Sequence, residues 1–150
     1  MVGLGNSLMA DDGFGEAVVG ALLRRGLPQG MTAEIAPDVL GLLSVWRGQE
    51  AVWMVDAVAL GESPGTIHRF EHDEIFGLQS GAGSAHHLSL VSNLQWMLHS
   101  HAGLRAVHFR LWGAEPATIA PGPYLSETVR AAVAQVALEI QSTASRPAAS

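Results

Sequence analysis

The side chains available for chemistry in this chain are mainly carboxylates and imidazoles, from 14 Asp and Glu residues and 7 His residues among 150. Cysteine is absent, which excludes disulfides, thiolate metal sites, iron–sulfur clusters and a cysteine nucleophile. All 8 basic side chains are Arg, and the absence of lysine excludes Schiff-base chemistry, a lysine general base and a P-loop lysine. The formal net charge of −6 argues against a nucleic-acid partner.

Three short segments place acids or histidines beside apolar patterns. Asp11 and Asp12 precede a helical pattern, and one of them could cap that helix, but two adjacent acids cannot both do so. Asp56 follows the apolar run 52–55, where a carboxylate is costly unless it is paired, hydrogen-bonded or bound to a cation. His86 and His87 follow a glycine-rich segment; they point in different directions, so at most one faces a site, and a single loop histidine is otherwise ordinary surface. Two carboxylates with one histidine form a ligand set for zinc, nickel, cobalt or iron.

Strand and helix patterns alternate along the chain and must bring these segments together. Strands are predicted at 1–4, 32–35, 51–55, 66–70 and 106–112, and helices at 13–25, 37–47, 87–99 and 126–140, the last capped by Ser126. The alternation predicts an α/β fold, a three-layer sandwich in which helices flank a mostly parallel twisted sheet with a stunted first strand. Functional groups gather at the carboxyl ends of the strands in such sheets. That rule selects the loop 5–12, Asp56 and the segment 113–116.

Two motifs that would indicate other chemistries are incomplete. A Gly-x-Gly after the first strand suggests dinucleotide binding, but Leu8 replaces the third glycine of the fingerprint and no suitable acid follows about 20 residues later. The segment around Ser84 lacks the nucleophile elbow of serine hydrolases, because Ala82 and His86 stand where that motif needs glycine.

Length and composition indicate a single domain. We expect residues 1–141 to form one α/β domain and the small, polar residues 142–150 to form a flexible C-terminal tail. No apolar run reaches the length of a membrane span, and the glycine-rich start lacks the pattern of a signal peptide. We therefore expect a cytoplasmic protein.

A series of motifs resembles, in order, those of the hydrogenase maturation proteases. The segment Gly3–Gly15 matches their opening pattern G-x-G-N-x-x-x-x-D-[DE]-G-x-G, which is specific. Weaker matches span nearly the rest of the chain: Val55–Val58 (V-D-A-V), Ser63–Gly65 (a P-G turn), Ser84–Leu88 (S-x-H-x-L), Gly113–Pro116 (G-x-E-P) and Pro121–Ser126 (P-G-x-x-L-S). The chain departs from the family in its short first strand and in Asp12, which stands where many members have Glu.

The resemblance implies a monomeric endopeptidase that removes the C-terminal extension from the precursor of a [NiFe] hydrogenase large subunit once nickel is inserted. It assigns the catalytic and metal-binding roles to Asp12, Asp56 and His86, and it suggests that Asn6 positions backbone or peptide. The nickel belongs to the precursor and is bridged to the protease. No organic cofactor, nucleic acid or membrane is implied. The segment 35–40 is similar to the branch that serves cytoplasmic bidirectional or NAD-coupled hydrogenases.

The resemblance leaves the chemistry of cleavage open. A carboxylate could act as general base, or a metal could lower the pKa of the attacking water, so the enzyme is either of the aspartic type or metal-dependent. Asp11 is a weaker candidate for a site residue: it either supports the residues that bind the metal without binding the metal itself, or it caps the helix. One rival hypothesis is a metal-sensing chaperone that binds the large subunit without cutting it. Another is a small nucleotide-binding domain.

Overall fold

The computed structural model describes residues 1–78 and 85–147, and for residues 85–89 it describes the backbone alone. The elements are, in chain order, β1 (Val2–Leu4), η1 (Ala10–Gly13), α1 (Phe14–Arg25), β2 (Glu34–Ala36), η2 (Val39–Gly41), α2 (Leu42–Val45), β3 (Ala51–Ala57), β4 (Ile67–Glu71), α3 (His72–Phe76), α4 (Ala85–Ser100), η3 (Ala102–Ala106), β5 (His108–Ala114) and α5 (Glu127–Ala144). Within the described residues, no helix combines the length and apolarity needed to cross a membrane.

The sheet has five strands in the order β2-β1-β3-β5-β4. All neighbouring pairs are parallel except β4 with β5, which is antiparallel and places β4 at one edge. The predicted α/β class and the mostly parallel sheet are therefore confirmed. The first strand is short, with 3 residues against 7 in each of β3 and β5.

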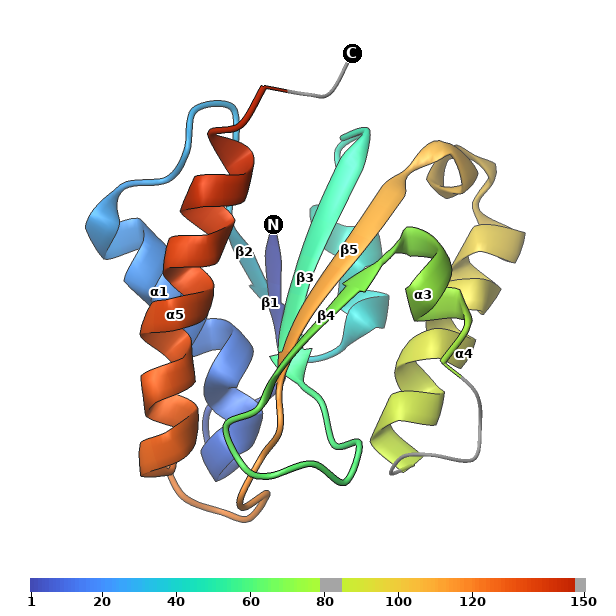
Figure 1. Ribbon diagram of the computed structural model, residues 1–150. Helices are drawn as coiled ribbons and strands as arrows, with labels where there is room; N and C mark the ends of the chain where they lie inside the picture. Colours follow the sequence, from blue (N-terminus) through green and yellow to red (C-terminus); the bar gives the residue numbers. More distant parts are fainter. Residues whose placement is uncertain (79–84, 148–150) are drawn as a thin grey trace.

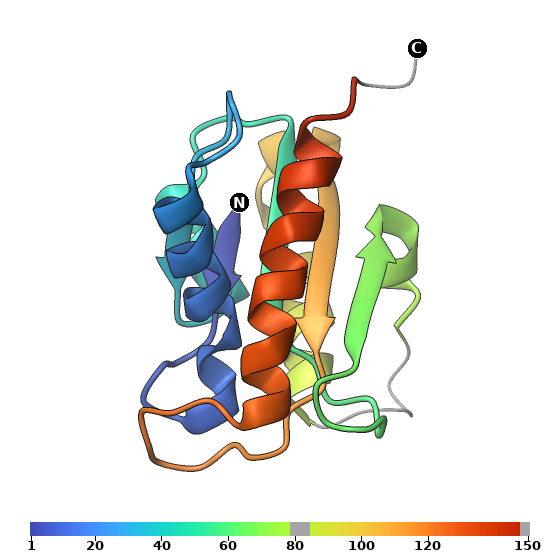
Figure 2. The same ribbon diagram turned by 60° about the vertical axis from the view of Figure 1, so that its left-hand side comes forward.

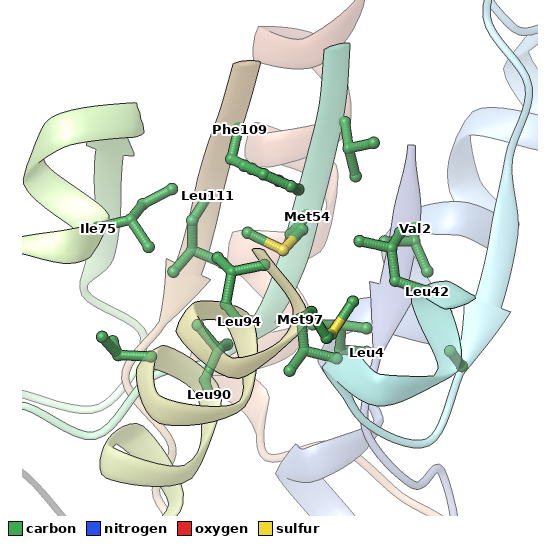
Figure 3. Packing of buried hydrophobic residues seen from close by; sticks show 14 of the residues in the cluster. Val2, Leu4, Leu42, Met54, Ile75, Leu90, Leu94, Met97, Phe109 and Leu111 are labelled. Atoms are coloured by element: carbon green, nitrogen blue, oxygen red, sulfur yellow. The ribbon is translucent and has the colours of Figure 1, made fainter. Parts of the chain in front are cut away.

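Helices cover both faces of this sheet (Figures 1 and 2). Helices α1 and α5 lie side by side on one face, and α4 with the short α3 lies on the other. Because side chains alternate along a strand, Met54 packs toward α4 while its neighbour Val55 packs toward α1 and α5. Figure 3 shows Met54 of β3 and Phe109 of β5 on this face of the sheet, together with side chains of α4 that fill the same half of the core. Full burial of each such side chain contributes about 1.5–3 kcal/mol.

Several predicted boundaries were wrong. The helix expected at 37–47 is instead a 3-10 turn followed by a short helix that ends at Val45. Directly after that end, the Trp46 indole donates a hydrogen bond to the carbonyl of Gln49 and closes a turn. Helix α3 was not predicted. Helix α5 continues beyond its predicted end at residue 140 to Ala144, so residues 142–144, expected in the tail, are helical. The Gln141 side chain anchors this end of α5 by donating to the carbonyl of Gly26.

Candidate active site at the carboxyl edge of the sheet

The carboxyl ends of β1, β3 and β5 meet at one edge of the sheet, at the bottom of Figure 1. The loops that follow these strands gather at the same edge. This is the place that strand polarity selects for function in parallel sheets, and both predicted acidic site residues lie here.

Asp56 is the penultimate residue of β3, which continues two residues beyond its predicted end at residue 55. Its neighbour across the sheet is Gly113 of β5. The residue is only 3% exposed, and its Oδ1 accepts a hydrogen bond of 2.9 Å from the amide of Ala57. Strand alternation places Asp56 on the same face as Met54, which is the face covered by α4. A carboxylate is thus held at a buried strand end, as predicted.

Asp12 lies in η1, directly before α1, and is partly exposed. Its Oδ2 accepts a hydrogen bond of 2.9 Å from the amide of Asn6. The Asn6 side chain in turn accepts from the amide of Leu8, so Asn6 organises the loop backbone, one of the two roles expected of it. Gly5 makes the arrangement possible, because it has a φ of +115° and a Cβ there would collide with the carbonyl oxygen of Asp12.

Two further glycines bring Asp12 and Asp56 to neighbouring strand ends. A Cβ on Gly15 would collide with the carbonyl oxygens of Leu4 and Val55, and a Cβ on Gly3 would collide with the carbonyl of Gly15. Helix α1 therefore approaches the ends of β1 and β3 backbone to backbone. Gly3, one of the two glycines that suggest a nucleotide fingerprint, serves here to pack a helix tightly against the sheet.

Asp11 has a different role from its neighbour. The side chain is fully buried, and its two oxygens accept four hydrogen bonds, of 2.8 Å from the amide of Ala117, 3.0 Å from that of Thr118, and 2.7 and 2.9 Å from the amide and hydroxyl of Ser126. Burial alone would raise the pKa of Asp11, but these hydrogen bonds outweigh it and hold the pKa below its usual value. Asp11 therefore fastens the loop before α1 to the loop before α5.

Ser126 is the N-cap residue of α5, as predicted, whereas Asp11, for which a helix cap was one of two expected roles, does not cap α1. Helix α1 has Gly13 at its N-cap position, and the Ser126 side chain donates to Asp11 instead of capping α5, although Ser126 is the N-cap residue. Only the adjacent pair of acids signalled a special role for Asp11, since its partners lie 106 to 115 residues away.

Glu115 is a third buried carboxylate at this edge, after Asp56 and Asp11, and we assigned no site role to it from the sequence. It accepts hydrogen bonds from the amides of Leu60 and Gly61, and one of 2.8 Å joins it to Nε2 of His68. Burial opposes ionisation, but these partners lower the pKa of Glu115 overall. The loop that follows Asp56 and Ala57 is thereby tied to the end of β5. His68 belongs to this structural group.

The third predicted site residue lies outside the described side chains. The backbone of His86 forms part of the first turn of α4, which begins at the same lower edge in Figure 1. Among the side chains that the structure describes, no three His, Asp or Glu residues are grouped so that they could hold a metal ion. The trio of Asp12, Asp56 and His86 therefore stays a prediction, with its two acids brought to one edge.

Comparison with known proteins relates the sequence and the fold of this chain to one family. The family model described as hydrogenase maturation protease matches residues 37–143. Protein FrxA of Pyrococcus furiosus is 32% identical over 126 residues, which cover 83% of this chain and 89% of that protein. The [NiFe] hydrogenase maturation protease HybD from Thermococcus kodakarensis superimposes with a TM-score of 0.76 at 27% identity, covering 97% of each chain. The maturating endopeptidase HybD from E. coli shares the fold, with a TM-score of 0.75 at 23% identity over 95% of this chain and 88% of that one.

Proposed function

Because the chain belongs to the hydrogenase maturation protease family, we propose that it removes the C-terminal extension from the nickel-loaded precursor of a [NiFe] hydrogenase large subunit. The observation that carries the proposal is the pair of acids at one sheet edge: Asp56 at the buried end of β3, and Asp12 against the loop that follows the neighbouring β1. Carboxylates so placed can meet a cation presented by another protein.

The proposed recognition step uses the precursor's own nickel. Asp12, Asp56 and His86 add oxygen and imidazole ligands to that ion, a donor set that suits borderline divalent metals. Their engagement signals that nickel is loaded and holds the scissile bond against the protease. The chain has no cysteine, so any thiolate ligands must come from the precursor.

Hydrolysis then requires an activated water. Either a carboxylate of this site acts as general base, or a metal ion lowers the pKa of the water. The hydrogen bond from Asn6 orients Asp12, and the buried position of Asp56 restricts its motion, so both carboxylates are preorganised for either route. We also infer that the protein acts as a monomer in the cytoplasm. Sedimentation would check the oligomeric state, and cell fractionation would check the compartment.

Mass spectrometry of the large-subunit precursor after incubation with the protein tests the proposal. The precursor encoded in the same genome is prepared with and without nickel, and we expect loss of the C-terminal extension only from the nickel-loaded form. Asp12→Ala, Asp56→Ala and His86→Ala should each abolish processing without unfolding the protein. His87→Ala is the matched control and should process nearly normally.

Other outcomes would point elsewhere. An intact C-terminus in a precursor that nevertheless binds the protein would identify a chaperone instead of a protease. An essential His87 with a dispensable His86 would move the assignment by one residue. Nickel soaked into crystals should be found against the same three side chains.

A further inference from the structure

Two loops beside Asp12 are joined into one platform, which we define as residues 6–10 and 117–125. The amide of Gly122 donates to the carbonyl of Leu8 at 2.9 Å, and the amide of Ala10 donates to the carbonyl of Gly122 at 2.8 Å. Asp11 reinforces the pairing, both through its amide and through its buried carboxylate. Figure 2 shows the two loops running side by side below α1 and α5. The platform is therefore held in place by backbone hydrogen bonds between its two loops and by the hydrogen bonds of Asp11.

The platform presents apolar side chains to solvent. Leu8 is 69% exposed, Ile119 50% and Tyr124 78%. The sequence has no charged side chain from residue 1 to 10, nor from 116 to 126. Large apolar side chains exposed on an uncharged surface mark sites of interaction with another molecule, and this surface borders the candidate site through the hydrogen bond from Asn6 to Asp12.

A groove of about 590 Å³ continues from the platform. Ala10, Gly13 and Pro123 line its platform end, and Asp12 lies between the first two of these in the chain. The charged side chains of the lining, Glu16, Arg24 and Arg130, all come from helices α1 and α5. The groove thus leads from an uncharged mouth at the platform along α1.

We propose that the platform and the mouth of the groove bind an uncharged, apolar segment of the hydrogenase precursor adjacent to the bond that is cut. The proposal rests on the proposed function, because only a polypeptide substrate must cover the surface around Asp12. A charged segment would lose hydration against this surface without gaining a partner. A permanent second copy of the chain is disfavoured, since it would cover the approach to Asp12.

Steady-state processing of the nickel-loaded precursor tests this binding surface. Leu8, Ile119 and Tyr124 are replaced by serine together, which removes exposed apolar surface without disturbing the core. We expect the KM to rise about tenfold or more while kcat stays within about twofold, because contacts of this kind stabilise the bound substrate and its transition state equally. Leu138→Ser is the matched control, because Leu138 is 50% exposed and lies in the C-terminal half of α5, whereas the platform precedes the N-terminus of that helix; both constants should stay unchanged.

Binding of the precursor to the wild type and the triple variant, followed by sedimentation, separates the two proposals. Weaker binding by the triple variant supports the platform even if the wild type does not cut, in which case only the cleavage function fails. Equal binding and equal KM for the triple variant and Leu138→Ser would overturn the platform while cleavage stands. No binding by the wild type would overturn both. A wild-type dimer that the triple variant dissociates, with KM unchanged, would assign the surface to self-association and overturn the proposal.

Discussion

Replacing Asp11 by Asn should destabilise the protein strongly at neutral pH, although the two side chains have nearly the same shape. Asp11 accepts hydrogen bonds at both oxygens, one at Oδ1 from the Ser126 amide and three at Oδ2 from the Ala117 and Thr118 amides and the Ser126 hydroxyl. Asparagine offers one oxygen and one NH₂ group. In its better orientation it keeps the three donors and turns its NH₂ group toward the Ser126 amide.

The expected loss follows from these contacts. The Ser126 amide is left without an acceptor in a buried site, which costs about 1–3 kcal/mol. The three remaining hydrogen bonds lose the charge of their acceptor, and neutral hydrogen bonds are roughly half as strong as charge-assisted ones. Since neighbouring effects do not add fully, we expect the free energy of unfolding to fall by about 3 kcal/mol, within the range that the separate terms allow.

The difference between Asp11→Asn and the wild type should depend on pH in a defined direction. The pKa of Asp11 is lowered in the folded protein, so its ionised form stabilises the fold above the unfolded pKa of about 3.9. That contribution is lost as the pH falls through the lower, folded pKa. The difference in unfolding free energy between the wild type and Asp11→Asn should therefore be largest at pH 7 and become smaller below about pH 4.

Urea denaturation followed by tryptophan fluorescence measures this difference. Asp73→Asn, an exposed acid on α3, is the matched control and should change stability little. A variant at Asp11 that is as stable as the wild type, or a loss that stays constant from pH 7 to pH 3, would refute the role assigned to this carboxylate.

Three further substitutions test other parts of the site. Glu115→Gln should lower the unfolding free energy at pH 7 by about 1–2 kcal/mol, because it weakens the hydrogen bonds to the 58–66 loop and to His68. The loss should be smaller below pH 4, since the folded pKa of Glu115 is also lowered. Equal stability at pH 7 would contradict this. Gly15→Ala should cost about 3 kcal/mol or more in thermal or urea unfolding, since its Cβ meets backbone oxygens that cannot move aside. Gly20→Ala on the same helix has room and should stabilise by about 0.5–1 kcal/mol, and a similar response at both glycines would show that close packing at Gly15 is unimportant.

Local patterns predicted most of the fold because most of its elements are held by local rules. The apolar run 52–55 and the spacing of apolar residues in α1 and α5 reflect burial on the faces where the structure places them. Helix α3 is only 5 residues long and carries a capping box from Glu71 to Glu74, too short a signal for periodicity to detect. The boundary of α5 moved because its last turn is fixed by Gln141, whose partner lies 115 residues away.

The site was predicted unevenly for the same reason. The position of Asp56 follows from the end of a buried strand, and that of Asp12 from the loop after the first strand, so both could be inferred from the chain itself. The roles of Asp11 and Glu115 depend on partners contributed by distant loops. Nothing in the local sequence distinguishes an acid that faces a site from an acid that ties two loops together.

The backbone contact between α1 and the sheet has a consequence for redesign. The close approach of α1, which follows Asp12, to β1 and β3 depends on Gly3 and Gly15, residues that carry no side chain at all. A wider site, suited to a larger ion or a bulkier metal centre, could therefore not be reached simply by adding a methyl group beneath the helix, because that change meets backbone oxygens and costs stability. Redesign of the site would have to change the ligands while keeping these glycines.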